Sequence, residues 1–184
     1  MAVRSRIRPD HAQVLVVDVQ ARLTPHIREH ESVVAQIVRT LRAARELALP
    51  ATVTEQYPSG LGPTEPTILA ETRDAPRFEK TTFSVWADEG CRTRITSLHR
   101  PVVMLVGIET HVCVQQTALD LLADGMEPWL LVDAVGSRRE VDRATAVERM
   151  RHAGVTVTTV ESCIYELMER AGTELFKRML PIVR

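Results

Sequence analysis

The sequence predicts an α/β fold, a three-layer α/β/α sandwich around a Rossmann-like sheet of about six mostly parallel strands. Short apolar runs alternate along the chain with longer segments whose apolar residues recur at helical spacing. The runs are continuously apolar, which is typical of parallel strands buried on both faces. The 184 residues leave room for one full hydrophobic core, so we expect a single domain over residues 1–184.

A βαβ unit opens the chain. Residues 14–17 form a short apolar strand that ends at Asp18. A helical pattern covers residues 34–44, and Pro50 ends it before a second strand at residues 51–54. A loop rich in glycine and proline then leads to a short helix, a third strand, a helix and a central buried strand. These are expected at residues 67–71, 78–80, 88–98 and 102–106.

The second half of the chain repeats the alternation. A helix is expected at residues 111–124, with Gly125 as its stop signal. Ser137 and Glu140 have the spacing of a capping box, which predicts a helix start there. The remaining expected elements are a strand at 129–132, this capped helix to about Met150, a strand at 155–160, and helices at 162–171 and 173–180. Because the strands are parallel, their carboxyl ends share one edge, where ligands bind in such folds.

Composition excludes several classes of partner. The formal net charge of −1 gives no electrostatic attraction to nucleic acid or an acidic membrane surface. No apolar run reaches the ~18 residues that a membrane span needs, and residues 1–10 are too charged for a secretory signal. We therefore expect a cytoplasmic protein that acts on a small-molecule substrate, without nucleic-acid or membrane partners.

The three cysteines are an odd number without a CxxC pair, which disfavours a disulfide framework or a four-ligand zinc site. Cys91 and Cys163 lie in helical patterns beside apolar residues and are interpreted as core residues. Cys113 instead follows a strand at a predicted helix start, where free N–H groups and the helix dipole favour a thiolate. Cys113 is the candidate nucleophile; the alternative is a small buried residue that closes the turn.

Four segments carry a resemblance to a known family. The run GIETHVCVQQTALD, from Gly107 to Asp120, resembles the nucleophile motif of the isochorismatase-like cysteine hydrolase superfamily. VLVVDVQ ending at Gln20, TEQYPSGLGPT ending at Thr64 and EKTTFS ending at Ser84 match further motifs in the same order. The resemblance covers nearly the whole chain and points most closely to the isochorismatase domain-containing hydrolase branch.

The expected site combines Asp18, Lys80 and Cys113. Asp18 and Cys113 emerge at the same sheet edge, and the resemblance adds Lys80. In this reading Asp18 is the general base, while Lys80 keeps Asp18 ionised and favours the thiolate. Backbone N–H groups of Cys113 and Glu109 form the oxyanion hole, the latter because the resemblance implies a cis peptide before Glu109. The alternatives are a helix-capping Asp18 and a solvated Lys80.

Loops after the first three strands offer candidate pocket residues. These are Gln20, Glu55, Gln56, Tyr57, Phe83 and Trp86. Substrate binding is assigned to Gln20, Gln56, Tyr57 and Phe83; the alternatives are loop surface, or core for the aromatic residues. In a chain with few aromatics, this clustering favours a small planar or apolar substrate.

Neither a metal nor a cofactor is expected. Superfamily members that hydrolyse nicotinamide carry an Asp-x-His motif and a further histidine after the second strand, whereas this chain has no histidine between His30 and His99. His26 and His30 lack a third ligand and are interpreted as surface residues. His111 is assigned a capping or interface role, because its spacing from Cys113 turns the two side chains apart on a helix.

The leading hypothesis is a metal-independent cysteine hydrolase that cleaves the C–N bond of a small amide through a thioester on Cys113. One alternative is hydrolysis of an isochorismate-type vinyl ether, which needs acid catalysis instead of a thiol. Another is a catalytically silent binding protein or thiol sensor. The resemblance also implies a homo-oligomer, dimer or larger, and the apolar residues 175–183 are a candidate part of its interface.

Overall fold

The structure, a computed structural model, describes residues 6–183 and confirms the predicted α/β sandwich. Its centre is one six-stranded sheet with the order β3-β2-β1-β4-β5-β6. Every neighbouring pair is parallel. The strands are β1 (Ala12–Val17), β2 (Ala51–Gln56), β3 (Arg77–Lys80), β4 (Val102–Ile108), β5 (Glu127–Gly136) and β6 (Thr156–Thr158).

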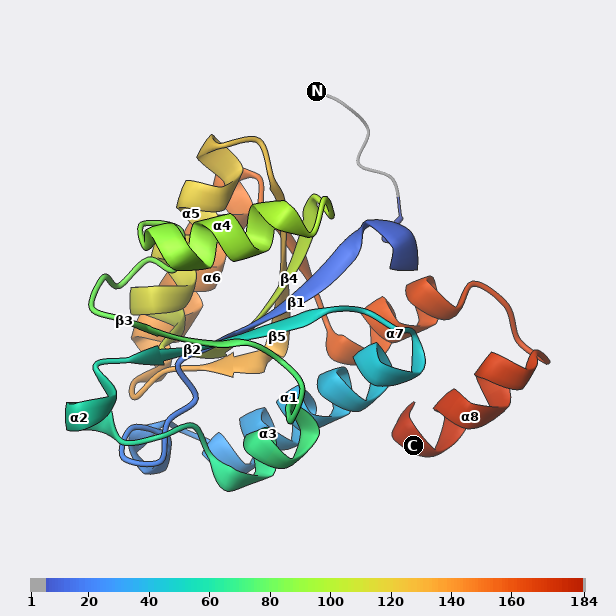
Figure 1. The fold of residues 1–184 in the computed structure, drawn as a ribbon, viewed down its shortest axis with the longest axis horizontal. Coiled ribbons are helices and arrows are strands. Elements are labelled where there is room, and N and C mark those ends of the chain that lie inside the picture. Colours follow the sequence, from blue (N-terminus) through green and yellow to red (C-terminus); the bar gives the residue numbers. More distant parts are fainter. Residues whose placement is uncertain (1–5, 184) are drawn as a thin grey trace.

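Helices cover both faces of the sheet (Figure 1). One layer contains α1 (His30–Glu46), α3 (Pro66–Glu71), α7 (Val160–Met168) and α8 (Glu174–Val183), and the other contains α4 (Glu89–Ser97), α5 (Gln115–Ala123) and α6 (Glu140–Ala153). Short helical turns lie at Pro9–His11, Thr24–His26, Pro58–Leu61 (α2) and Thr110–Val114. Within residues 6–183, no helix is both long enough and apolar enough for a membrane crossing.

Strand β1 shows why residues 14–17 form an unbroken apolar run. All six of its residues are buried. Val14 and Val16 pack in the core beneath α1, whereas Leu15 and Val17 pack in the core beneath α4 and α5. Because successive side chains point to opposite faces of a strand, each face supplies one of the two cores.

The predicted starts of α6 and α7 differ from those in the structure. The capping box does not form, because α6 begins at Glu140 without a side-chain cap and the Ser137 hydroxyl lies 3.0 Å from Nδ1 of His111 instead. The last strand ends at Thr158, and Val160 opens α7 behind a Thr159 cap that accepts from the Ser162 N–H. At Ser137, a contact with a residue distant in the sequence replaces the expected capping box. At Thr159, a side-chain cap starts the helix two residues earlier than the apolar pattern predicted.

The segment 111–124, predicted as one helix, is divided in the structure. A π-helix runs over Thr110–Val114, and α5 begins only at Gln115. Single π turns of this kind occur often at functional sites. Cys113 therefore lies inside an irregular turn and not in the first turn of an α-helix.

Gly107 allows β1 and β4 to approach closely beside the sheet edge. Its φ is +124°, and a Cβ added there would lie 2.1 Å from the carbonyl oxygen of Val17. Only glycine avoids this overlap. The close approach brings the end of β4 next to Asp18, the residue that follows Val17.

Helix α8 is packed within its own chain. Met179 and Val183 are buried in the core beneath α1, and Leu175, Phe176 and Ile182 pack against it. The amphipathic pattern of residues 175–183 thus serves intrachain packing, and a contact of this segment with a second copy stays a prediction.

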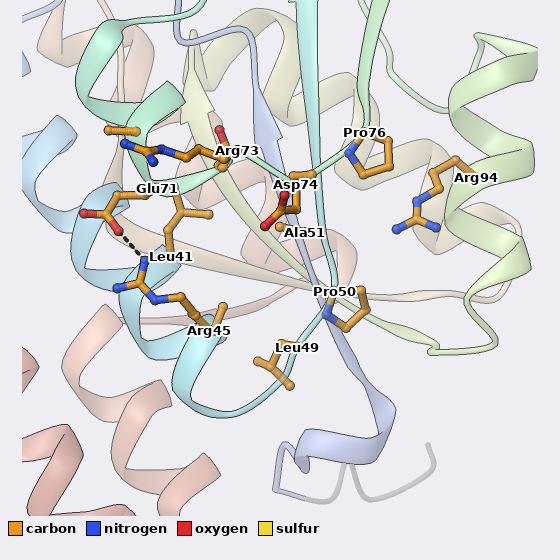
Figure 2. Close-up of a pocket in the computed structure, with 14 residues that line it drawn as sticks. Leu41, Arg45, Leu49, Pro50, Ala51, Glu71, Arg73, Asp74, Pro76 and Arg94 are labelled. Carbon is orange, nitrogen blue, oxygen red and sulfur yellow. Dashed lines mark hydrogen bonds and ion pairs between the residues drawn. The ribbon is translucent and has the colours of Figure 1, made fainter.

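A hollow lies at the amino-terminal ends of β2 and β3, at the edge opposite the expected site, and Asp18, Lys80 and Cys113 do not line it. Glu71 stands at its border and joins α3 to α1, as Figure 2 shows. Its carboxylate accepts from Nε of Arg42 at 2.7 Å and from Nη1 of Arg45 at 2.8 Å. Burial raises the pKa of Glu71, but the hydrogen bonds and charges of the two arginines outweigh it and hold the pKa below its ordinary value.

Replacing Glu71 by glutamine will reduce stability in a pH-dependent way. The native carboxylate has the lower pKa, so its stabilisation is complete above the ordinary pKa of 4.5 and is lost as pH falls through the native value. We expect a loss of about 1 kcal/mol at pH 7 and a smaller loss at pH 3. Urea unfolding at both pH values measures it, with the exposed Glu148→Gln as a control. Equal losses at both pH values would contradict the assignment.

Candidate active site

Asp18 and Lys80 form a buried ion pair at the carboxyl edge of the sheet. Asp18 directly follows β1, and Lys80 is the last residue of β3. Nζ of Lys80 lies 2.7 Å from Oδ2 of Asp18, and neither side chain has any exposed surface. The pairing places opposite charges in a dry environment, where their interaction is only weakly screened.

Lys80 is held by three further acceptors. Nζ donates to Oε1 of Gln56 at 2.7 Å and to the carbonyls of Thr82 at 3.0 Å and Phe83 at 3.2 Å. An ammonium group has three protons, so this environment satisfies it completely. A solvated surface lysine, the alternative considered for Lys80, is therefore wrong.

Asp18 is fixed from a second side by Thr54. The Thr54 hydroxyl donates to Oδ1 of Asp18 at 2.7 Å, and the Asp18 N–H donates to the Thr54 carbonyl at 3.2 Å. Asp18 adopts a left-handed conformation with φ of 51° and caps no helix. Sequence reasoning missed Thr54; the signal available was its place at the end of the strand that pairs with β1.

Cys113 follows β4, the strand on the other side of β1 from β2 and β3, and lies near Asp18. The residue is 6% exposed, and its side chain packs in the core beneath α4 and α5. Burial raises the pKa of the thiol, the charge of Asp18 and a hydrogen bond to it raise the pKa further, and Lys80 lowers it by less. The thiolate expected from a helix start is thus wrong for the resting protein, in which Cys113 is a thiol beside a carboxylate.

Thr117 connects Cys113 to the segment after β3. Its hydroxyl donates to the Cys113 carbonyl at 2.7 Å and accepts from the Val85 N–H at 2.9 Å. The chain between Lys80 and Val85 is consequently tied at both ends, to the ion pair and to the π-helix.

Cys91 and Cys163 behave as the core residues that the sequence predicted. Both are fully buried. Burial, with Asp88 near Cys91 and Glu166 near Cys163, raises the pKa of each thiol to about 12. The charges of Lys80 and Asp18 also reach the Cys91 thiol.

The segment that carries Glu109 is anchored to the start of α6. The peptide bond between Ile108 and Glu109 is cis. The Glu109 carboxylate accepts from Nε of Arg138 at 3.1 Å and from the Arg138 N–H at 3.0 Å. Sequence reasoning missed Arg138, because the two residues lie far apart in the chain and only the order of β4 and β5 brings them together.

Gln20, expected to bind substrate, is instead a support of the neighbouring loop. It is completely buried. Its amide nitrogen donates to the carbonyls of Gln56 at 3.1 Å and Gly62 at 2.7 Å, and its oxygen accepts from the Gln56 N–H at 2.8 Å. With every polar atom bonded to backbone and no exposed surface, Gln20 positions Gln56, which in turn contacts Lys80.

Two other candidates are also structural. Glu55 accepts from the N–H and the hydroxyl of Thr64 at 2.8 and 2.6 Å. Trp86 is buried and donates its indole N–H to Asp124. By contrast, Tyr57 and Phe83 are 58% and 55% exposed, so of the candidate aromatic residues these two offer surface to a ligand.

The histidines do not extend the site. Nδ1 of His111 lies 3.0 Å from the Ser137 hydroxyl, and Nε2 lies 4.0 Å from Asp142. His111 therefore lies at the interface between the π-helix and the start of α6, within one chain. His26 is exposed. Among the residues that the structure describes, no three His, Cys, Asp or Glu side chains gather closely enough to hold a metal.

Fold and side chains together define an α/β protein with a buried carboxylate–ammonium pair and a thiol at the carboxyl edge of its sheet. Residues 12–162 match the family described as Isochorismatase domain, so the chain belongs to the isochorismatase-like hydrolases. A curated relative, isochorismatase domain-containing protein 2 of Danio rerio, is 38% identical over 180 residues, covering 97% of this chain and 90% of its own.

Solved structures agree with this assignment. The MAR1 ribonuclease from Caenorhabditis elegans is 38% identical with a TM-score of 0.91 and covers 97% of this chain and 92% of its own. YcaC from Pseudomonas aeruginosa, solved with covalent acrylamide, is 25% identical with a TM-score of 0.92 and covers 99% of this chain and 93% of its own. The Escherichia coli YcaC product, an octameric hydrolase of unknown specificity, is 26% identical with a TM-score of 0.91 and covers 100% of this chain and 95% of its own.

Proposed function

We infer that this protein is a metal-independent cysteine hydrolase of small amides, acting as one domain over residues 1–184. The observation that carries the proposal is the buried Lys80–Asp18 pair with the Cys113 thiol beside the same carboxylate. A thiol, a base and a group that orients the base are the parts that covalent acyl transfer requires.

The raised pKa of Cys113 fits a base that acts during attack. As Sγ forms a bond to the substrate carbonyl carbon, the thiol proton passes to Asp18 and the carbonyl electrons move to oxygen. Backbone N–H groups of Cys113 and Glu109 are proposed to bind that oxyanion. The proton on Asp18 then passes to the leaving nitrogen as the C–N bond breaks.

Water completes the cycle. It attacks the thioester carbon and gives its proton to Asp18, the S–C bond breaks, and the sulfur regains a proton. Lys80 holds a positive charge against Asp18 through these steps, which keeps the carboxylate ionised and ready to accept a proton. The products are a carboxylic acid and ammonia or an amine.

The expected partners follow from the same reading. The octameric Escherichia coli structure supports a homo-oligomer of this chain as well. A net charge of −1 offers no attraction to a polyanion, so we propose a small-molecule substrate in place of nucleic acid or membrane, and do not carry over the ribonuclease activity of the nematode protein. Three free cysteines suit the reducing cytoplasm.

The test is mass spectrometry after exposure to a library of small amides and, separately, to chloroacetamide near neutral pH. We expect an acyl group trapped on the Cys113 peptide, and chloroacetamide labelling much faster at Cys113 than at Cys91 or Cys163, because Asp18 accepts the Cys113 thiol proton during attack. Covalent acrylamide in the Pseudomonas structure supports the choice of such reagents. Equal, slow labelling of all three thiols without an acyl adduct would favour the silent thiol-sensor alternative.

A further inference from the structure

The two exposed aromatic side chains near the site are both attached to Lys80 through their backbones. The Tyr57 N–H donates to the Lys80 carbonyl at 3.0 Å, and the Phe83 carbonyl accepts from Nζ of Lys80 at 3.2 Å. More than half of each residue is exposed, 58% for Tyr57 and 55% for Phe83. They therefore flank the residue that holds Asp18, and they leave apolar surface uncovered there.

Tyr57 is held in an uncommon backbone conformation. Its φ and ψ are 40° and 63°, in the left-handed region that bulky residues avoid. The carbonyl of Tyr57 accepts from the N–H groups of Gly60 at 2.9 Å and Leu61 at 3.1 Å, within the α2 turn that lies beside the ends of β2 and β3 (Figure 1). Strain of this kind persists where surrounding contacts fix it, and it is found often at ligand sites.

Gly60 sets where the Tyr57 ring lies. A Cβ on Gly60 would be 2.5 Å from Cδ1 and 2.7 Å from Cε1 of that ring. The Cδ1–Cε1 edge of the ring therefore lies close to Gly60, although most of the residue is exposed. A hollow lined by Tyr57, Glu79, Lys80 and Asp88, among others, opens beside it.

We propose that Tyr57 and Phe83, here called the aromatic pair, bind a planar apolar group of the substrate, and that Gly60 positions Tyr57 for this contact. The inference rests on the proposed function and names its substrate class: amides that carry an aromatic or similarly flat apolar substituent. Stacking covers the exposed ring surface when the substrate arrives, and such contacts are specific for flat groups.

Alkylation of Cys113 tests the aromatic pair without a known substrate. The reagents are 2-iodoacetamide and 2-iodo-N-phenylacetamide, each rate divided by the rate of the same reagent with glutathione. In either reaction Sγ forms a bond to the methylene carbon, the C–I bond breaks, iodide leaves and the thiol proton passes to Asp18. We expect the phenyl reagent to be preferred by about tenfold or more in the unchanged protein.

The variants distinguish the loss of an aromatic ring from the displacement of the Tyr57 ring. Tyr57→Ala and Phe83→Ala should each remove most of the preference, and Gly60→Ala should do the same by displacing the Tyr57 ring. Adding Gly60→Ala to Tyr57→Ala should have no further effect, because no ring remains to be displaced. Tyr165→Ala is the matched control: this tyrosine is 46% exposed on α7, in the layer away from Cys113, and the variant should keep the preference.

The outcomes are distinguishable. If iodoacetamide labels Cys113 no faster than Cys91, the proposed function fails. If it labels Cys113 selectively but the phenyl reagent shows no preference, or the preference survives in both Tyr57→Ala and Phe83→Ala, the aromatic pair is overturned. A change in particle mass on light scattering of these two variants would assign the pair to contact with a second copy and also overturn the proposal.

Discussion

Replacing Lys80 by methionine will lower the free energy of unfolding by about 3–5 kcal/mol, because it leaves the Asp18 carboxylate buried without its partner. Both side chains are fully buried, so water cannot take over from the ammonium group. Methionine keeps the length and apolar stem of lysine, so the change removes chiefly charge and hydrogen bonds. Chemical denaturation followed by circular dichroism measures the loss.

Two further variants make this result specific. The other lysine of the chain, Lys177, pairs with Glu174 at 2.7 Å but is 64% exposed, so Lys177→Met should cost at most about 0.5 kcal/mol. The double change Asp18→Asn with Lys80→Met removes both charges and should be more stable than Lys80→Met alone. A double variant as unstable as Lys80→Met would show that the unpaired carboxylate is not the cause.

Replacing Cys113 by alanine will reduce turnover of any amide substrate by about 10⁴-fold or more, because no other nucleophile replaces the thiol in the acyl transfer. The side chain is small and its loss leaves the ion pair intact, so the variant should remain folded. Steady-state ammonia release with the substrate identified by acyl trapping measures the effect.

The remaining thiols provide the controls. Cys91→Ala and Cys163→Ala remove equally small, fully buried side chains from the core, and we expect these changes to lower stability and leave turnover intact. Full turnover by Cys113→Ala, or an equal loss in Cys91→Ala, would exclude the thioester route.

The positions of the candidate site residues could be predicted because each stands at the end of a recognisable strand. Asp18 follows a fully apolar run, and Lys80 closes the short β3 segment. In a parallel sheet these ends must share one edge, so the convergence depends on fold class alone. Lys80 required the family resemblance in addition, since a lone lysine after a short strand carries no local signal.

The partners of these residues could not be predicted, because they depend on strand order and loop packing. Thr54 reaches Asp18 only because β2 lies beside β1, and Arg138 reaches Glu109 only because β5 lies beside β4. The side chain of Gln20 bridges two loops, and no periodic pattern reports such a contact. The protonation of Cys113 was misjudged for a related reason: a helix start was visible in the sequence, but burial and the charge of Asp18 were not.

The complete burial of Lys80 also allows the protein to be attached to a dye or a surface through one lysine side chain. The sequence contains two lysines. Lys80 has no exposed surface, whereas Lys177 lies 64% exposed on α8, in the layer opposite α5 and the thiol that precedes it. Apart from the terminal amine, an acylating dye or an activated resin therefore finds a single lysine, remote from the sheet edge, and immobilisation through it leaves that edge facing free solution.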